Sequence, residues 1–135
     1  MIILTLAGRE LRQLEIVKYT PKYEPLDSEA TGRSRAAGWE LMRFPDGLIC
    51  NFAIEIFAPR SDNRDFIFLM DRFIEISMSG HVGFVPVIHR DMLNRIWNQQ
   101  MYFTVDGVDC EKFENNFVYM DNVKVNFIAR RGRVR

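Results

Sequence analysis

The sequence predicts a mainly β, α+β domain: an antiparallel β-sandwich or small barrel with one packed amphipathic helix. Apolar and polar residues alternate over short stretches, aromatic residues make up 13% of the 135-residue chain, and one segment alone has convincing helical spacing. A chain of this length fits one domain with a sizeable core. We therefore assign residues 1–129 to a single β domain and residues 130–135 to a basic C-terminal tail.

The N-terminal third predicts two strands followed by a long loop. Residues 1–6 and 14–20 each have the apolar alternation of a strand. Residues 21–38 contain prolines, charged pairs and many Ala, Gly and Ser residues, which interrupt every periodicity. Unstructured loops of this length are uncommon in compact domains and are usually functional or become ordered on binding. We therefore expect loop 21–38 to be a functional element.

Turn signals predict three β-hairpins. Pro45-Asp46-Gly47 lies between two apolar stretches within residues 39–57. Asp106-Gly107 and Asp121-Asn122 occupy the corresponding positions within residues 101–113 and 117–129. These residue types supply the backbone angles that tight turns require, so each is expected to join two paired strands.

The helix is predicted over residues 62–77. Asp62 is expected to cap its N-terminus, Asp65 lies in the first turn, and Gly80 follows its end. Asp71 and Glu75 fall on the solvent side, and we expect all four carboxylates to point outward. The apolar positions recur with helical spacing at Phe66, Leu69, Met70, Phe73 and Ile74.

The segment after the helix gives mixed signals. Residues 81–89 predict a strand in which Pro86 favours an edge or a bulge. Residues 91–99 are ambiguous, although their apolar residues suit a short helix. Those apolar residues are Met92, Leu93, Ile96 and Trp97.

No pattern in the sequence indicates catalysis, a metal or a cofactor. The two histidines, His81 and His89, flank one predicted strand; His89 and Asp91 could form an oriented imidazole, yet no motif places a nucleophile beside them. The acidic stretch 106–111 lacks the spacing of a calcium-binding EF-hand, and the expected turn accounts for it. Phosphate-binding loops, nucleophile elbows and zinc motifs are absent from the sequence. We predict a protein that is not an enzyme and has no small-molecule substrate.

Charge and cysteine content further restrict the class of protein to which the chain can belong. The net charge is zero, but four arginines lie in the last six residues, which leaves fourteen basic and eighteen acidic residues in the body. This balance gives no global case for nucleic-acid binding. Cys50 and Cys110 lie in strand-like surroundings and are expected to be buried free thiols in a reducing cytoplasm. Neither a signal peptide nor a membrane-spanning segment is predicted.

Several short stretches resemble small structural proteins of tailed phages and prophages of Gram-positive bacteria. They are Thr31-Gly32-Arg33-Ser34 and Ala37-Gly38 before Trp39, then FVPVIH and VKVNFIARRG near the end. The order of elements is similar to the tail-tube fold, in which a β-sandwich carries one helix and a long loop contacts the next ring. The resemblance implies a tail-tube or baseplate component that forms a ring, with a hexamer as the expected form, among other virion tail proteins. It implies a protein made in the host bacterial cytoplasm and located in the virion tail, with DNA only as passing cargo.

The resemblance also implies which residues contact neighbouring subunits. Arginines of loop 21–38 would pair with carboxylates of the next subunit, and the basic tail would dock on a neighbour. Two alternatives remain open: a small β-barrel that binds single-stranded nucleic acid, and a head-completion or tail-terminator protein. The predicted contact residues are Thr31, Gly32, Arg33, Ser34, Arg35, Gly38, Trp39, Arg130, Arg131 and Arg133.

Overall fold

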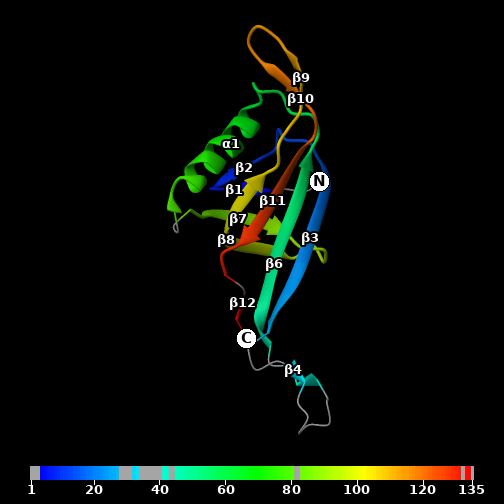
Figure 1. Cartoon of the computed structure of the whole chain (residues 1–135), viewed down its shortest axis with the longest axis vertical. Helices are drawn as coiled ribbons and strands as arrows, with labels where there is room; N and C mark the ends of the chain where they lie inside the picture. Colours follow the sequence, from blue (N-terminus) through cyan, green and yellow to red (C-terminus); the bar gives the residue numbers. More distant parts are fainter. Residues whose placement is uncertain are drawn as a thin grey trace.

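The computed structural model describes residues 4–27, 32–33, 41–42, 45–80, 83–131 and 133–134. Within these ranges the chain forms twelve strands and one helix (Figure 1). The strands are β1 (Thr5–Leu6), β2 (Arg9–Glu10), β3 (Ile16–Asp27), β4 (Gly32–Arg33), β5 (Leu41–Met42), β6 (Pro45–Ile56), β7 (Val85–Arg90), β8 (Ile96–Val105), β9 (Cys110–Phe113), β10 (Val118–Met120), β11 (Val123–Ala129) and β12 (Arg133–Val134). Helix α1 spans Arg64–Ser77.

Eight strands form one antiparallel sheet, in which the long strand β6 lies next to the edge strand β3. β3 pairs with β6 along its whole length, while β11 and β12 pair with different parts of β6. Because a strand has two edges, β11 and β12 follow one another along the edge that β3 leaves open. The sheet continues through β8, β7, β1 and β2, and its described strands do not close into a barrel. The predicted mainly β class with one packed helix is confirmed.

The core lies between helix α1 and one face of the sheet. Phe66, Leu69 and Ile76 of α1 are buried, and the ring of Phe73 lies 5.8 Å from that of Phe103 on β8. The alternation predicted for two strands is confirmed, since every second residue of each is buried. These residues are Phe52, Ile54 and Ile56 of β6 and Val123, Val125 and Phe127 of β11.

The helix begins at Arg64, and its N-cap is not the predicted one. Asn63 is the N-cap, and its side-chain oxygen accepts hydrogen bonds from the amides of Asp65 and Phe66 at 3.0 and 3.1 Å. Asp62 instead forms an ion pair with Arg60. The expectation that all helix carboxylates point outward is wrong for Asp65, which is 2% exposed.

The main departure from prediction concerns residues 21–38. Residues 21–27 belong to β3, and β4 and β5 pair beyond its end, so described parts of this stretch form a β-hairpin rather than a loop. Pro45 and Gly47 lie inside β6, where they face Asp27 and Leu26, so no turn forms at 45–47. The loop was predicted because two prolines, Pro21 and Pro25, are atypical of a strand. An edge strand such as β3 tolerates prolines when their nitrogen faces away from the partner strand.

The two C-terminal hairpins were also predicted with the wrong partners. β8 pairs with β7 and β11, whereas β9 pairs with β10. Residues 96–129 therefore form one long interrupted hairpin whose reversal lies at residues 114–117, where the Glu114 amide donates to the Phe117 carbonyl at 2.9 Å. At the two turn dipeptides the segment after β8 and the segment before β11 leave the main sheet side by side and continue as β9 and β10. The β9–β10 hairpin lies at one end of the molecule (Figure 1).

Two smaller expectations need correction. Residues 91–99 do not form a helix: β8 begins at Ile96, and residues 92–93 form a turn. Cys110 is exposed rather than buried, while Cys50 is buried as predicted. His81 falls within 81–82, outside the ranges given above, and β7 begins at Val85.

Candidate assembly surfaces

The first group of predicted contact residues lies on an extension of the β3–β6 hairpin. Gly32 and Arg33 form β4 and pair with Met42 and Leu41 of β5. β4 lies beyond the far end of β3 and β6, at the end of the long axis opposite β9–β10 (Figure 1). The other residues predicted for this group belong to parts of the chain that the structure does not describe. They are Thr31, Ser34, Arg35, Gly38 and Trp39.

The second group lies in the basic C-terminal segment. Arg130 and Arg131 are exposed directly after β11, and the guanidinium of Arg130 lies 4.9 Å from the ring centre of Phe84. Arg133 belongs to β12, where its backbone pairs with Leu48 of β6. The segment assigned as a separate tail therefore adds a short strand to the main sheet.

Strand β6 brings the two groups of contact residues together. Gly47 and Leu48 pair with Leu26 and Pro25 of β3 and also with Val134 and Arg133 of β12. The strand that leads to the β4–β5 extension is thus flanked by the basic C-terminal strand. Sequence reasoning gave no signal for this, because the pairing partners lie far apart in the chain.

We use the name arm for residues 45–51 of β6, their partners in β3, and the β4–β5 extension beyond them. β11 pairs only with residues 52–56 of β6, so the arm continues past the end of β11. Seven residues at a rise of about 3.3 Å give a projection of roughly 20 Å. β12 pairs with Leu48 and Gly47 within this stretch, and the rest of the stretch is a two-stranded ribbon, which needs additional contacts to be stable in water. The arm receives them at its base.

A buried hydrogen-bond chain fixes the base of the arm to β7 and β8. The Gln99 side-chain amide donates to the Cys50 carbonyl and to His89 Nε2, each at 2.8 Å. His89 Nε2 then carries no proton, so Nδ1 is protonated in the neutral ring and donates to the Tyr19 hydroxyl at 3.0 Å. The Tyr19 hydroxyl in turn donates to the Arg90 carbonyl. All the donors and acceptors in this series of hydrogen bonds are satisfied only when His89 is neutral.

The surroundings of His89 also favour the neutral ring. Its imidazole is 1% exposed and lies 4.2 Å from the ring centre of Phe52. Burial lowers the pKa of His89 to about 4. Burial likewise raises the pKa of the Tyr19 hydroxyl well above its ordinary value. A buried imidazole has no open face for a substrate, so the geometry serves to hold the arm.

Asp91 forms a second connection between the arm and the β7–β8 hairpin. Its carboxylate accepts hydrogen bonds from the Tyr23 hydroxyl on β3, from Trp97 Nε1 at 2.8 Å, and from the amides of Leu93 and Arg95, each at 2.9 Å. Burial acts to raise the pKa of Asp91, but these donors outweigh it and hold the pKa well below its ordinary value. The hydrogen bond to Asp91 is the main cause that raises the pKa of Tyr23 to about 12. His89 and Asp91 therefore bind different partners rather than forming the oriented pair that the sequence suggested.

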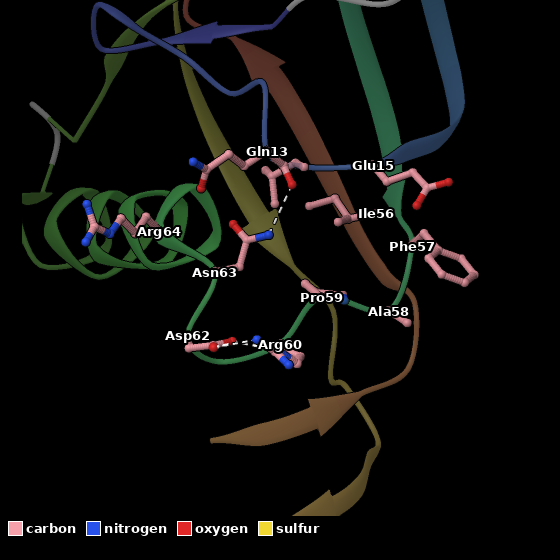
Figure 2. Close-up of a pocket in the computed structure, with 11 residues that line it drawn as sticks. Gln13, Glu15, Ile56, Phe57, Ala58, Pro59, Arg60, Asp62, Asn63 and Arg64 are labelled. Atoms are coloured by element: carbon pink, nitrogen blue, oxygen red, sulfur yellow. Dashed lines mark hydrogen bonds and ion pairs between the residues drawn. The ribbon is translucent and has the colours of Figure 1, made fainter. Parts of the chain in front are cut away.

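A hollow of about 500 Å³ lies where the β6–α1 connection meets the β2–β3 connection (Figure 2). The Asn63 side chain donates to the Gln13 carbonyl at 3.1 Å inside it, and Arg60 forms a two-point ion pair with Asp62 at 2.7 and 2.9 Å. Phe57 and Glu15 point away from the centre. The Asn63–Gln13 hydrogen bond therefore joins the two connections, whereas the Arg60–Asp62 ion pair lies within one of them.

The described ranges contain no group of three or more His, Cys, Asp or Glu side chains placed to hold a metal ion. In the stretch that loosely resembled a calcium loop, Asp121 raises the pKa of Glu111 through a hydrogen bond and its negative charge. Among the helices of the described part of the chain, none is long and apolar enough to cross a membrane.

The aromatic residues bear on the nucleic-acid alternative. Single-strand binders present aromatic rings on an exposed sheet face, where bases stack. Here Phe52, Phe103 and Phe127 stack on one another in the core, with ring centres 4.4 and 4.9 Å apart. These three rings are therefore directed away from solvent, whereas Tyr102 of β8 is exposed.

Comparison of the chain with protein-family models, with curated proteins and with solved structures finds no significant match. The functional assignment therefore depends on the geometry described above and on the resemblance noted in the sequence.

Proposed function

We propose that this protein is a structural subunit of a phage virion, of the tail-tube or baseplate-ring type, and that it acts by self-assembly rather than catalysis. One observation carries the proposal: strand β6 joins the two segments predicted to contact neighbours, since β3 and β12 both pair with Gly47 and Leu48. The β4–β5 extension continues from this point away from the body (Figure 1). A projecting arm that carries a basic strand along its outer half is suited to reach a neighbouring subunit.

The arm would contact the next ring through side chains. β3 forms the outer side of the arm, and among the described strands it pairs only with β6. Pro21 and Pro25 lie in this strand and remove two amide donors, which disfavours continuous β-pairing with another chain. Arg33 would instead pair with carboxylates of the neighbour. The body, with fourteen basic and eighteen acidic residues, has no excess of positive charge that would bind phosphate strongly, as a DNA-conducting tube requires.

The test is negative-stain electron microscopy of the full chain at rising concentration, beside an arm-shortened variant. In this variant Asn-Gly replaces residues 27–46, so that Leu26 and Gly47, which face each other in the register, flank a two-residue turn. We expect stacked rings from the full chain and single rings from the variant. Arg33→Glu, which keeps the hairpin, should also reduce stacking.

A full chain that stays monomeric at every concentration would contradict the proposal, as would a shortened variant that stacks like the full chain. Circular dichroism must show that both variants retain the β spectrum. Titration with labelled single-stranded oligonucleotides at low and high salt is the control for the nucleic-acid alternative, because such binding weakens steeply with salt.

A further inference from the structure

The two ends of strand β8 carry surfaces of opposite charge. At its N-terminal end lies the turn between β7 and β8, which we call the β7–β8 tip (residues 90–96). At its C-terminal end the chain leaves for the β9–β10 hairpin (residues 106–122). Ten residues of strand separate the two surfaces by about 30 Å. One copy therefore cannot bring its own surfaces together through this strand.

The β7–β8 tip is apolar and basic. Met92, Leu93 and Ile96 are 57%, 62% and 58% exposed, although large apolar side chains gain free energy from burial. Arg95 is exposed and has no ion-pair partner among the residues whose side chains the structure describes. Asp91 is the acidic residue of the tip, and its carboxylate is turned inward. The outer surface of the tip thus carries a positive charge and apolar side chains that are exposed to water.

Hydrogen bonds fix the shape of the tip before any partner binds. The Asp91 carboxylate accepts hydrogen bonds from the amides of Leu93 and Arg95, and the Arg90 guanidinium donates to the Asn94 carbonyl at 3.2 Å. Asn94 has a φ of +61°, a left-handed conformation that asparagine adopts more readily than most residues. A preorganised surface loses little conformational entropy on binding.

The β9–β10 hairpin is acidic and carries one highly exposed aromatic ring. Its seventeen residues include five carboxylates and one lysine, Lys112, which pairs with Glu114 at 2.6 Å. Phe113 is 73% exposed. A hydrogen bond with Asp121, together with the negative charge of that carboxylate, raises the pKa of Glu111. The hairpin therefore has an excess of negative charge around an exposed apolar side chain.

Contacts with the β6–α1 connection hold the hairpin in place. The Ser61 amide donates to the Val118 carbonyl at 3.1 Å, and the Val118 amide donates to the Ser61 hydroxyl at 2.7 Å. The guanidinium of Arg60 lies 4.6 Å from the ring centre of Phe117. Both the acidic hairpin and the basic tip are therefore attached to the body by specific bonds.

We propose that the β9–β10 hairpin of one copy docks on the β7–β8 tip of a second copy, with Phe113 against Met92 and Leu93 and with Arg95 facing the hairpin carboxylates. This inference rests on the proposed function, because it names the contact within a ring, whereas the arm contacts the next ring. The two surfaces differ, so the contact is head-to-tail, and its repetition gives a closed ring or a filament. Complementary charge at both surfaces favours this pairing over like-to-like contacts.

Reciprocal charge changes test the contact in the full-length chain. The tip variant is Arg95→Glu, and the hairpin variant is Asp109→Lys with Glu114→Lys; all three side chains are exposed. Arg64→Glu on α1 is the matched charge control. Leu93→Ser and Ile74→Ser form the matched apolar pair, since Ile74 is 54% exposed on α1. Assembly is followed by sedimentation velocity over a concentration series.

We expect each charge variant alone to raise the midpoint concentration of assembly at least about tenfold, because like-charge contacts are costly. An equimolar mixture of the two should return to within about threefold of the unmodified chain, since every interface in an alternating assembly regains opposite charges. Leu93→Ser should weaken assembly, and both α1 controls should leave it unchanged.

If the unmodified chain assembles and Arg95→Glu assembles equally well, the docking inference is wrong while the proposed function stands. An equimolar mixture that recovers nothing also refutes the head-to-tail pairing. A chain that never assembles overturns both the docking inference and the proposed function. The arm-shortened variant separates the contact within a ring from the contact between rings, because it is expected to affect stacking and to leave single rings intact.

Discussion

The neutral state of His89 predicts that stability falls as pH decreases. Burial lowers the pKa of His89 to about 4 from an ordinary value near 6.5. The native state thus excludes a proton that the unfolded chain binds, so the free energy of unfolding decreases between pH 6.5 and 4 and levels off below that. At about 1.4 kcal/mol per pKa unit the difference corresponds to about 3 kcal/mol.

Urea unfolding at several pH values from 7.5 to 4 measures this loss, and His89→Gln is the control. Carboxylates whose pKa is lowered by folding, such as Asp91, also cost stability near pH 4, because the unfolded chain begins to bind protons there, but this loss is common to the unmodified protein and the variant. The difference between the two pH profiles therefore isolates His89. Glutamine does not titrate, so the variant should start from lower stability at pH 7.5 and show a flatter profile. Equal slopes in both proteins would refute the tautomer assignment and the buried chain built on it.

Three further predictions follow from burial. Asp65→Asn should lower the free energy of unfolding by about 1–3 kcal/mol in urea titrations, because Asp65 accepts from Arg9 Nε at 2.8 Å and from the Gln13 amide at 2.6 Å; an unchanged midpoint would contradict this. Phe127→Ala should cost about 3–5 kcal/mol by thermal unfolding, since its ring is fully buried between two others, and a smaller loss would mean that the core refills. A thiol reagent should modify Cys110 in the native protein and Cys50 only after unfolding, and equal native reactivity would refute the assigned burial.

The sequence predicted those elements whose signal is contained in their own residues. The apolar spacing of residues 66–74 identifies α1 because a helix needs no distant partner for its hydrogen bonds. The alternation of β6 and β11 likewise gave the correct buried faces, since the side-chain period of a strand is fixed at two. Such patterns report which residues are buried and say nothing about which strand lies beside which.

Strand pairing is where the prediction failed, and the physical reason is the same in each case. Asp-Gly and Asp-Asn specify a local change of chain direction, which here takes the segment after β8 and the segment before β11 out of the main sheet together. The Asp106 amide still donates to the Lys124 carbonyl at 3.2 Å, and the Asp121 amide donates to the Asp109 carbonyl at 3.0 Å. Antiparallel pairing therefore continues through both bends. A turn dipeptide cannot distinguish a reversal from such a paired bend.

The candidate site was predictable only in part. Arginines and small residues marked the segment that includes β4, and composition marked the basic C-terminus. The connection of the basic C-terminal strand to β6 depends on pairing across about 85 residues of sequence, which no local pattern encodes. The tyrosines of β3 gave one usable signal: Tyr19 and Tyr23 lie on the same face of a strand, as residues four apart do. Buried tyrosines need hydrogen-bond partners, and His89 and Asp91 supply them.

The buried polar contacts also relate the two proposed contact surfaces to each other. Asp91 shapes the β7–β8 tip through the amides of Leu93 and Arg95 and at the same time binds Tyr23 of the arm. Tyr23 pairs with Cys50, and the Cys50 carbonyl accepts from Gln99 of β8. The arm and the tip thus share one hydrogen-bonded framework, so a displacement of one is resisted by bonds to the other. In the proposed assembly this framework would keep the direction of the arm fixed relative to the contact within a ring, as regular stacking of rings requires.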